Sequence, residues 1–503
     1  MTLINRFSVR ILLFFISFYS TVLVAQENPI ARQYGEQVLL SDLKDNLSII
    51  ASDALEGRKT GSRGQKMAAA FIRAHFEELG LAGPVDGSYY QNVPLYAITA
   101  GNAMIKTNTA SLQNYKDFVY TGLSELAGNE TEVVFVGDGE EASLEKIELT
   151  GKVALVIAEK NINDIPTEAL LSKGAKAVMV CNSKDEKTFT AYANRMKRSF
   201  ESARMTLKKP ASGGQMGSII FVSSAAVEKI LNEKFDDLKS YSSDPKKLKK
   251  IRKVKTGIIS YAFHNSIKLV NSENVLGYLE GTDKKEELIV VTAHYDHIGK
   301  KSEGAGDLIN NGADDDGSGT VAVLELAKVF AKAKAEGNGP KRSILFMTVT
   351  GEEMGLLGSQ YYSENPVFSL SSTVVDLNID MIGRRDPEHK DKPDYVYVIG
   401  SDKLSTELHQ LSEKTNSIYT HLDFDYTYND ENHPTNLYKR SDHWNFAKNN
   451  IPIVFYFDGI HEDYHLPSDE VDKIDFELLT KRTKLVFYTA WELANREQRI
   501  KND

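Results

Sequence analysis

The stretch Gly312-Ala-Asp-Asp-Asp-Gly-Ser-Gly319 places three consecutive carboxylates in a glycine-rich segment. Neighbouring carboxylates repel one another, so a cation that offsets their charge favours such a cluster. The glycines permit a tight turn. Ser318 can cap the apolar run Val321–Phe330, which has the composition of a buried helix. We therefore expect this loop to supply a ligand shared by two metal ions. For this stretch alone, an aspartate-rich surface turn that caps a helix is the alternative.

Length and composition indicate a globular protein with a large core. The 503 residues are enough for two to four domains. The formal net charge of −10 gives no indication of nucleic-acid binding. The only cysteine, Cys181, excludes an intramolecular disulfide and lies in an apolar run, which predicts a small core residue.

Residues 1–25 have the composition of a signal peptide. Arg6 and Arg10 precede the apolar stretch Ile11–Val24, which is short for a membrane span and is followed by the small residue Ala25. We expect export through this signal, to the periplasm or the medium, and no stable membrane insertion after cleavage. An uncleaved N-terminal anchor is the alternative.

Two regions precede the α/β part of the chain. From Gln26 to about Tyr96 the pattern is helical, with one apolar face across Gly64–Gly80. Within this region Arg58 is expected in a solvated turn, with a position near an active site as the alternative. Residues 101–264 alternate short β-like runs with helices and hold no cluster of histidine and carboxylates at ligand spacing. In Lys246–Lys255 apolar residues recur every three positions, which predicts a packed face with solvated lysines rather than a patch for anionic surfaces.

From Asn274 onward, strands alternate with helices. The strand-like runs are Leu288–Ala293, Ser343–Val349, Val374–Asp380, Tyr395–Ile399 and Ile453–Phe457. This alternation predicts a mostly parallel central sheet with helices on both faces, a three-layer α/β/α domain. His294, Glu352, Glu353 and Asp380 stand at or just after strand ends, where open α/β sheets place their ligands.

The polar residues of this part form a set suited to divalent metal ions: His294, Asp315, Glu353, Asp380 and His465. Imidazole and carboxylate ligands together favour zinc. Two dications carry four positive charges, and three carboxylates with one hydroxide would bring the site near neutrality. We therefore expect two metals, each with one histidine and one terminal carboxylate. One carboxylate of Asp314–Asp316 would bridge them, and charge counting does not distinguish the three.

Three further residues are candidates for catalysis. Glu352 adjoins a candidate ligand, and a carboxylate that does not bind metal can take a proton from water and pass it to the leaving amine. Asp296 can accept the N–H of the His294 imidazole and so determine which nitrogen faces the metal. Tyr464 can polarise a carbonyl or stabilise an oxyanion. For the Glu352-Glu353 pair the alternative is a solvated acidic turn.

Two other histidines have weaker claims to a catalytic role. For His443, in the polar stretch Arg440–His443, a hydrogen-bonded structural role stands beside catalysis. For His433 the structural role is favoured.

The order of these motifs resembles that of peptidase family M28, zinc metallopeptidases that include aminopeptidases. The matching stretches are Val291–Gly299, Asn311–Gly319, Gly351–Ser359, Leu377–Met381, Arg440–His443 and Tyr464-His465, with a looser match at Leu55–Arg58. The middle region resembles a protease-associated (PA) domain at Thr150–Val156 and Lys173–Val178. The resemblance implies an N-terminal part of the catalytic domain in residues 26–100, a smaller β-rich PA-like domain in 101–264, and the M28-like catalytic domain in 265–503.

The resemblance also implies a role for each residue. One zinc ion would be held by His294, Asp315 and Asp380, and the other by Asp315, Glu353 and His465. Glu352 would be the general base and Asp296 the hydrogen-bond partner of His294. The peptide bond between Asp315 and Asp316 would be cis. The implied activity is that of an exported two-zinc aminopeptidase, which removes N-terminal residues from peptide substrates.

Two other functions are compatible with the same residues. Relatives that cyclise N-terminal glutamine use a single metal at a similar site. A non-catalytic binding protein would instead recognise a partner through the PA-like region and keep a structural metal. The sequence indicates no nucleic-acid partner and contains no signal for an oligomeric state.

Overall fold

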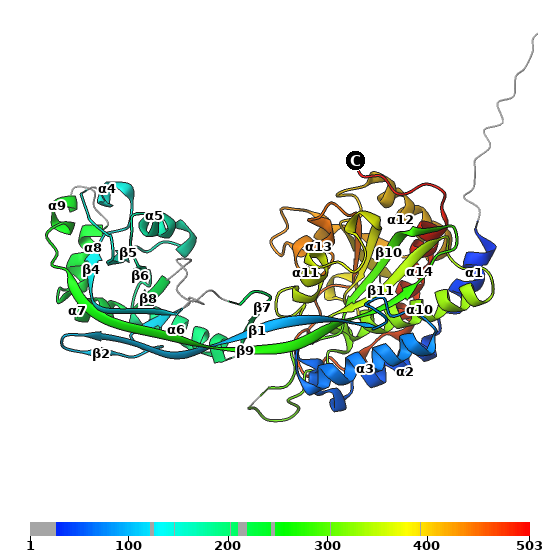
Figure 1. Cartoon of the computed structure of the whole chain (residues 1–503), viewed down its shortest axis with the longest axis horizontal. Coiled ribbons are helices and arrows are strands. Elements are labelled where there is room, and N and C mark those ends of the chain that lie inside the picture. The colour runs from blue at the N-terminus through cyan, green and yellow to red at the C-terminus, as the bar shows by residue number, and fades with distance from the viewer. Residues whose placement is uncertain are drawn as a thin grey trace, which may run out of the picture.

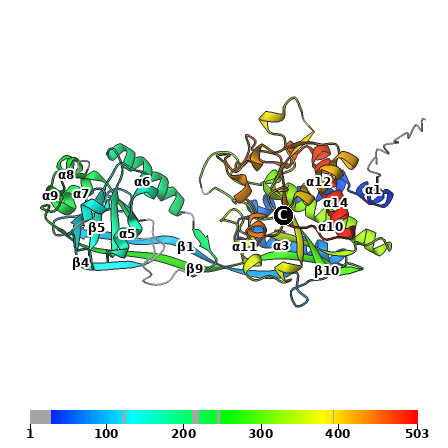
Figure 2. The same ribbon diagram turned by 90° about the horizontal axis from the view of Figure 1, so that it is seen from above.

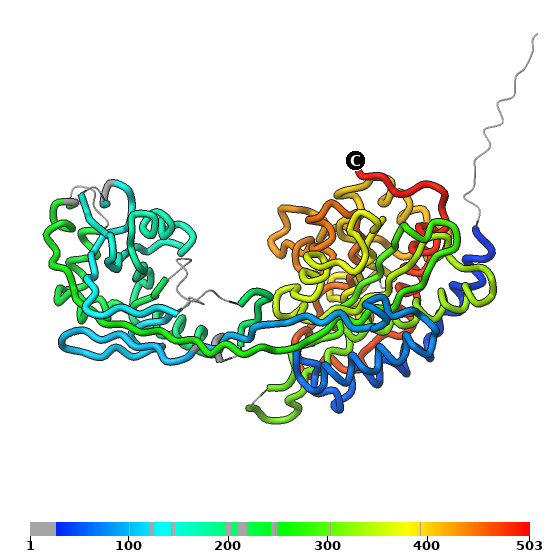
Figure 3. The backbone as a smooth tube through the Cα atoms, in the orientation of Figure 1, coloured from blue at the N-terminus to red at the C-terminus, as the bar shows by residue number. Residues whose placement is uncertain are grey.

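The computed structural model describes residues 27–120, 125–144, 146–201, 203–209, 219–242, 247–301, 303–392 and 394–503. The signal peptide predicted over residues 1–25 lies outside the described residues. Within these ranges, the helices are too short or too polar to cross a bilayer. Two lobes lie at opposite ends of a long ribbon of two strands (Figures 1 and 3).

The ribbon consists of β1 (Tyr90–Thr107) and β9 (Gly257–Leu279), which pair antiparallel from Tyr90↔Val275 to Thr107↔Ile259. The expected helical pattern up to Tyr96 is therefore wrong at its end. Val93, Leu95 and Ala97 are buried at every second position, which is the period of a strand. A β-bulge lies between Ala100 and Ala103, and Ala100 pairs with Asn265. The expected domain boundaries, after residue 100 and after residue 264, therefore lie opposite each other within β1 and β9. Each strand continues across its boundary.

The larger lobe is built on a mixed sheet of order β14-β13-β15-β12-β10-β11-β9. The further strands are β10 (Lys284–His294), β11 (Arg342–Val349), β12 (Thr373–Ile379), β13 (Tyr395–Ile399), β14 (Asp423–Asp425) and β15 (Ile453–Phe457). β10 pairs parallel with β11 and β12, and β12 pairs parallel with β15. β9 and β13 run antiparallel to β11 and β15. The sheet is parallel at its centre, as expected.

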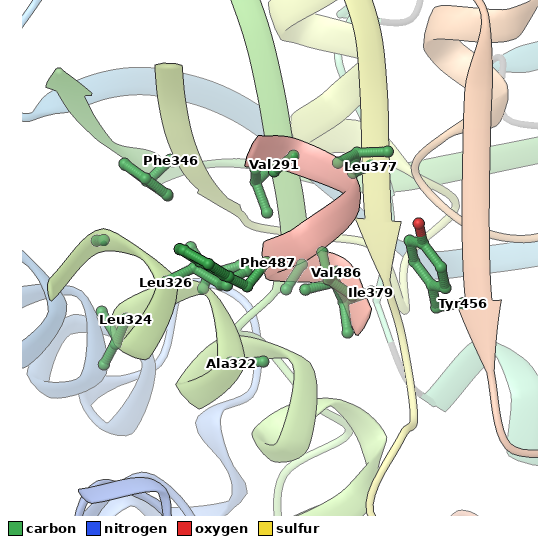
Figure 4. Close-up of a cluster of buried hydrophobic side chains, with 14 of the residues drawn as sticks. Val291, Ala322, Leu324, Leu326, Phe346, Leu377, Ile379, Tyr456, Val486 and Phe487 are labelled. Carbon is green, nitrogen blue, oxygen red and sulfur yellow. The ribbon is translucent and has the colours of Figure 1, made fainter. Parts of the chain in front are cut away.

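Helices cover both faces of this sheet because the strand side chains that project to each face are apolar. One face packs against α10 (Gly319–Ala335) and α14 (Phe476–Asn495), together with α1 (Pro29–Gly35), α2 (Leu40–Ile50), α3 (Arg63–Glu78) and α12 (Thr406–Tyr419). Figure 4 shows part of this core, where Val291 and Leu377 of the sheet cluster with Leu326 of α10 and Phe487 of α14. The other face packs against α11 (Leu357–Glu364) and α13 (Trp444–Ala447).

In the part of the chain that the structure describes, the smaller lobe continues the same sheet beyond β9 and has its own cores. Its strands are β2 (Ser111–Leu112), β3 (Phe118–Tyr120), β4 (Leu126–Phe135), β5 (Val153–Ile157), β6 (Ala177–Cys181) and β8 (Ile219–Val222), and β7 (Arg204–Thr206) pairs with β1. Its helices are α4 (Glu141–Leu144), α5 (Thr167–Ser172), α6 (Glu186–Glu201), α7 (Ser224–Leu231), α8 (Phe235–Ser242) and α9 (Leu248–Ile251). Figure 2 shows this lobe well separated from the larger one along β1 and β9.

Two expectations for the smaller lobe are confirmed. Cys181 is buried in the core, as its apolar neighbours predicted. In the basic segment, Ile251 is buried and Val254 packs against the same core, whereas Lys249 and Lys250 are exposed.

Phe487→Ala should lower the free energy of unfolding of the larger lobe by about 3–5 kcal/mol, because it empties a fully buried site between the sheet and α10. Both tryptophans, Trp444 and Trp491, lie in this lobe, so fluorescence-monitored urea unfolding measures it. Met67→Ala is the matched control, since Met67 is 40% exposed on α3. Equal losses in the two variants would contradict the packing described here.

Candidate metal centre

The polar residues singled out from the sequence meet at one edge of the larger lobe's sheet. His294 is the last residue of β10, and Asp380 directly follows β12. Glu352 and Glu353 follow β11. Asp315 lies in the turn η4 (Ala313–Ser318) before α10, and His465 lies beyond the end of β15. Since β10, β11 and β12 are parallel, their carboxyl ends share an edge, as the sequence predicted.

The three carboxylates of the aspartate loop, Asp314–Asp316, differ in their hydrogen bonds. The Asp316 carboxylate accepts from the N–H groups of His294 (3.1 Å), Gly319 (2.9 Å) and Met381 (3.1 Å). The Asp314 carboxylate accepts from the Gly383 N–H at 2.7 Å. No backbone N–H of the described residues donates to the Asp315 carboxylate, so it remains available to the surrounding imidazoles. The structure thus distinguishes the three aspartates. The Asp315–Asp316 peptide bond is cis, as the resemblance implied.

Asp314 also faces a buried histidine outside the expected ligand set. The Nε2 atom of His461 lies 3.2 Å from Asp314 Oδ2, and both side chains are fully buried. Burial alone would lower the pKa of His461, but Asp314 raises it to about 9. This ion pair connects the loop that carries His465 to the aspartate loop.

Arg58 is buried beneath this edge rather than solvated, so the expectation of a solvated turn is wrong. Its guanidinium donates to the carbonyl oxygens of Tyr295 (2.8 Å), Ile50 (2.7 Å), Asn311 (2.6 Å) and Gly312 (2.9 Å). The planar, multidentate guanidinium suits several acceptors at once. Arg58 therefore holds the segment after His294 against the aspartate loop and does not itself enter the candidate site.

Asp315 stands between two groups of ligand atoms. Its Oδ1 lies 3.3 Å from His294 Nε2, which in turn lies 3.5 Å from Asp380 Oδ1. Its Oδ2 lies 3.0 Å from His465 Nε2, which lies 3.2 Å from Glu353 Oε2. All five residues expected as ligands are therefore brought together, with Asp315 positioned to be shared.

His297 also belongs to the second group, although sequence reasoning did not assign it. Its Nδ1 lies 2.9 Å from Glu353 Oε1 and 3.8 Å from Asp315 Oδ2, and its side chain is fully buried. His297, Asp315 and Glu353 have ligand atoms close enough together to hold an ion. The available signal was a second histidine three residues after His294 in the same matched stretch.

Several ligand atoms of this centre are buried without a hydrogen-bond partner among the described residues. They are Asp315 Oδ2, Glu353 Oε1, His465 Nε2 and both ring nitrogens of His297. Buried polar atoms are normally satisfied, and carboxylate oxygens with imidazole nitrogens are ligands that zinc prefers. The residues present therefore fit the divalent metal pair that the sequence predicted.

Asp296 interacts with His294 through its main chain rather than its carboxylate. The His294 Nδ1–H donates to the Asp296 carbonyl oxygen at 3.1 Å, because a carbonyl can only accept. This leaves Nε2 facing the carboxylates. Asp296 therefore accepts the imidazole N–H, as expected, but with its carbonyl oxygen. Its carboxylate has other partners: Oδ2 accepts from the Thr60 hydroxyl at 2.6 Å, and Oδ1 accepts from the Glu352 N–H at 3.2 Å. Burial raises the pKa of Asp296 to about 6.

Glu352 lies beside the first group without being part of it. Its Oε2 is 3.9 Å from His294 Nε2. Burial raises the pKa of Glu352 well above its ordinary value, and the nearby Glu353, Asp380 and Asp442 add to the rise.

A narrow cavity of about 40 Å³ opens beside Glu352 and His294. We call it the apolar cavity after the apolar part of its lining, which consists of Met381, Leu437, Phe455, Phe457 and Ile460. Polar side chains also line it: Asp315, Asp380, Arg440, Ser441 and Tyr464. The Tyr464 ring stacks on His465 with centroids 3.9 Å apart. Burial raises the pKa of Tyr464, so its hydroxyl keeps its proton.

His443 and His433, the two histidines with weaker claims to catalysis, have the surroundings of structural residues. His443 is fully buried, and its Nε2–H donates to the Tyr438 carbonyl oxygen at 2.8 Å. Burial lowers the pKa of His443 to about 3. His433 Nδ1 lies 2.7 Å from the Thr435 hydroxyl oxygen, away from the candidate ligands.

Known structures share this fold over most of the chain. The aminopeptidase from Aneurinibacillus sp. strain AM-1 superposes with a TM-score of 0.56 at 19% identity, covering 93% of this chain and 97% of that one. The zinc aminopeptidase BSAP from Bacillus subtilis gives a TM-score of 0.50 at 18% identity, covering 92% and 98%. At such low identity the likeness establishes the fold alone.

Sequence comparison finds similar proteins over part of the chain. Aminopeptidase YwaD of Bacillus subtilis is 27% identical over 240 residues, 46% of this chain and 46% of the relative. A protein of Arthroderma otae named "Probable leucine aminopeptidase" is 30% identical over 216 residues, 42% of this chain and 55% of the relative. The chain thus spans about half the length of the curated relatives that it matches. Residues 274–490 match the model of Peptidase family M28, so this part of the chain is similar to that family.

Proposed function

We propose that this protein is an exported two-zinc aminopeptidase that removes N-terminal residues from peptides. The observation that carries the proposal is the placement of Asp315 between two histidine-carboxylate groups, with Glu352 3.9 Å from His294 Nε2. The family match over residues 274–490 supports a peptidase. The two sequence relatives, Aminopeptidase YwaD of Bacillus subtilis and the "Probable leucine aminopeptidase" of Arthroderma otae, support cleavage from the N-terminal end.

The residues of each group have distinct roles in this proposal. His294, Asp315 and Asp380 would hold one ion, and Asp315, Glu353 and His465 the other. His297 adds a fourth donor to the second group. Zinc bound there would polarise the scissile carbonyl and lower the pKa of water in the site.

Glu352 acts as the general base and then as the general acid. Its carboxylate, 3.9 Å from His294 Nε2, is placed to take up the proton released when water attacks the scissile carbonyl. The protonated carboxyl group then donates to the leaving amine. The Asp296 carboxylate acts as a positioning group, since it accepts the Glu352 N–H and the Thr60 hydroxyl. Tyr464 keeps its hydroxyl proton and is proposed to donate it in a hydrogen bond to the developing oxyanion.

The apolar cavity supports a role for one substrate side chain. It is small and lies beside Glu352 and His294, so it can take the side chain of the N-terminal residue and exclude a longer chain. Its lining by Met381, Leu437, Phe455 and Phe457 favours an apolar side chain. We also propose that the export signal takes the protein out of the cytoplasm, where it acts on peptides. The smaller lobe is its PA-like part.

Glu352→Gln should lower kcat by about 10²–10⁴-fold while the zinc content stays at the wild-type value, because the amide cannot take up the proton. Hydrolysis of leucine p-nitroanilide and metal analysis of the same preparation measure the two quantities. Glu364→Gln, at an exposed position of α11, is the matched control. Undiminished turnover of the Glu352 variant would refute the assignment.

Removal of zinc with a chelator should lower the Tm, because the ions bind the folded state and offset buried carboxylates. At free zinc about 100-fold above its Kd, the stabilisation expected from linkage is about 2.7 kcal/mol. Titration of zinc into the apo-protein should reach two ions per chain. Asp380→Asn and Glu353→Gln should each retain one. A wild-type stoichiometry of one ion would instead favour a one-metal enzyme that cyclises N-terminal glutamine. The mass of the product distinguishes cyclisation from hydrolysis.

A further inference from the structure

A second cavity adjoins the candidate metal centre on the side of Glu353 and His465. Its volume is about 640 Å³, far larger than that of the apolar cavity. Glu352, Arg440 and Tyr464 line both cavities, so the two meet at the proposed general base. We call the larger one the cationic pocket because Lys439, Arg440 and Lys448 line it.

The three cations form one wall of the pocket without an internal counter-charge. They come from one short segment, in which Lys439 ends η8 (Leu437–Lys439) and Lys448 follows α13. All three are exposed, and none forms an ion pair with a residue that the structure describes. The only carboxylates that line the pocket are Glu352 and Glu353, which face the imidazoles of the metal centre.

The fold keeps part of this positive charge in place. The Lys439 ammonium lies 5.4 Å from the centre of the Trp444 ring, within the range of a cation–π contact. Trp444 packs in turn against the hydrophobic core beneath α13. Arg440 adds a planar guanidinium, which binds carboxylates in a bidentate manner. The wall is therefore suited to an anionic group of a bound ligand.

We propose that the cationic pocket binds a substrate carboxylate on the leaving-group side of the scissile bond. The proposal rests on the aminopeptidase function proposed above and specifies its substrate class. With the N-terminal side chain in the apolar cavity, the next residues must lie in the larger pocket, because the two cavities meet at Glu352. Successive residues of an extended peptide advance about 3.3 Å, so one or two residues bring a carboxylate into this pocket.

Such a carboxylate has two sources in peptides. One is the C-terminal carboxylate of a dipeptide or tripeptide, and the other is an Asp or Glu side chain shortly after the scissile bond. Both kinds of carboxylate would meet the same cations. A protein that recognises the C-terminal carboxylate would prefer short peptides, such as the products of other peptidases. The protein would in either case discriminate against basic residues at these positions.

The test compares kcat/KM for four substrates: Leu-Ala, Leu-Ala-amide, Leu-Glu-amide and Leu-Gln-amide. The first pair isolates the C-terminal carboxylate, and the second pair isolates the acidic side chain. For wild type, the ratio within at least one pair should exceed one. Lys439→Gln and Lys448→Gln should each lower that ratio about two- to fivefold, the size expected for exposed ion pairs. Raised ionic strength should lower it as well.

Lys414→Gln is the matched control, since Lys414 is an exposed lysine of α12 away from the pocket. It should leave both ratios at their wild-type values. Ratios near one in wild type, or ratios that the Lys439 and Lys448 variants leave unchanged, would overturn the proposal.

A binding measurement separates failure of this proposal from failure of the aminopeptidase assignment. Calorimetric titration of Leu-Ala and Leu-Ala-amide, and of Leu-Glu-amide and Leu-Gln-amide, into the full-length Glu352→Gln variant needs no turnover. Tighter binding of the carboxylate member of a pair, weakened by the added Lys448→Gln change, supports the pocket even if no peptide is cleaved. Equal binding within both pairs overturns it, whereas hydrolysis of all four substrates at equal rates would leave the aminopeptidase function standing.

Discussion

Burial of like charges within a few ångströms of one another is the constraint that organises the larger lobe. Asp314, Asp315, Asp316, Glu353 and Asp380 are buried or nearly so at one sheet edge. Leaving such groups uncompensated would cost several kcal/mol each. Backbone amides compensate Asp316, an amide and the His461 imidazole compensate Asp314, and the remaining carboxylates face His294, His297 and His465.

This compensation depends on loops that cannot move independently. Arg58 binds four carbonyl oxygens from three segments, and the loop after β12 supplies the Met381 and Gly383 amides that bind Asp316 and Asp314. The edge is therefore cross-linked by hydrogen bonds that are buried, where an unpaired partner would be costly. A rigid set of ligand atoms is what a metal pair and a directed proton transfer both require.

The surroundings of Glu352 differ in chemistry on its two sides. One side is a small cavity with aromatic and aliphatic walls, and the other is a large pocket with a cationic wall. A ligand that spans Glu352 thus meets aromatic and aliphatic side chains at one end and Lys439 with Lys448 at the other, and Arg440 lines both cavities. The smaller lobe reaches the larger one through β1 and β9, two long strands whose continuous pairing makes the connection a ribbon rather than a flexible linker.

Much of the fold could be predicted because its signals are local. Apolar runs such as Leu288–Ala293 and Ser343–Val349 mark parallel strands, and polar residues directly after them mark the shared edge. The two long ribbon strands were harder to predict. β9 mixes buried and exposed positions because it borders two lobes in succession, so no single pattern continues along it. The basic segment before β9 was interpreted correctly, since its apolar positions recur at a helical spacing.

The sequence by itself determined the kinds of candidate ligand, their order and their positions at strand ends, since residue type and neighbouring periodicity are enough for that. Only the tertiary structure decided which aspartate is free, that His297 joins the second group, that Asp296 uses its carbonyl oxygen, and that Arg58 is buried. The reason is competition for hydrogen-bond partners. The amides of Met381 and Gly383, which occupy Asp316 and Asp314, lie 65 and 69 residues away in the chain, and only folding brings them to the aspartate loop.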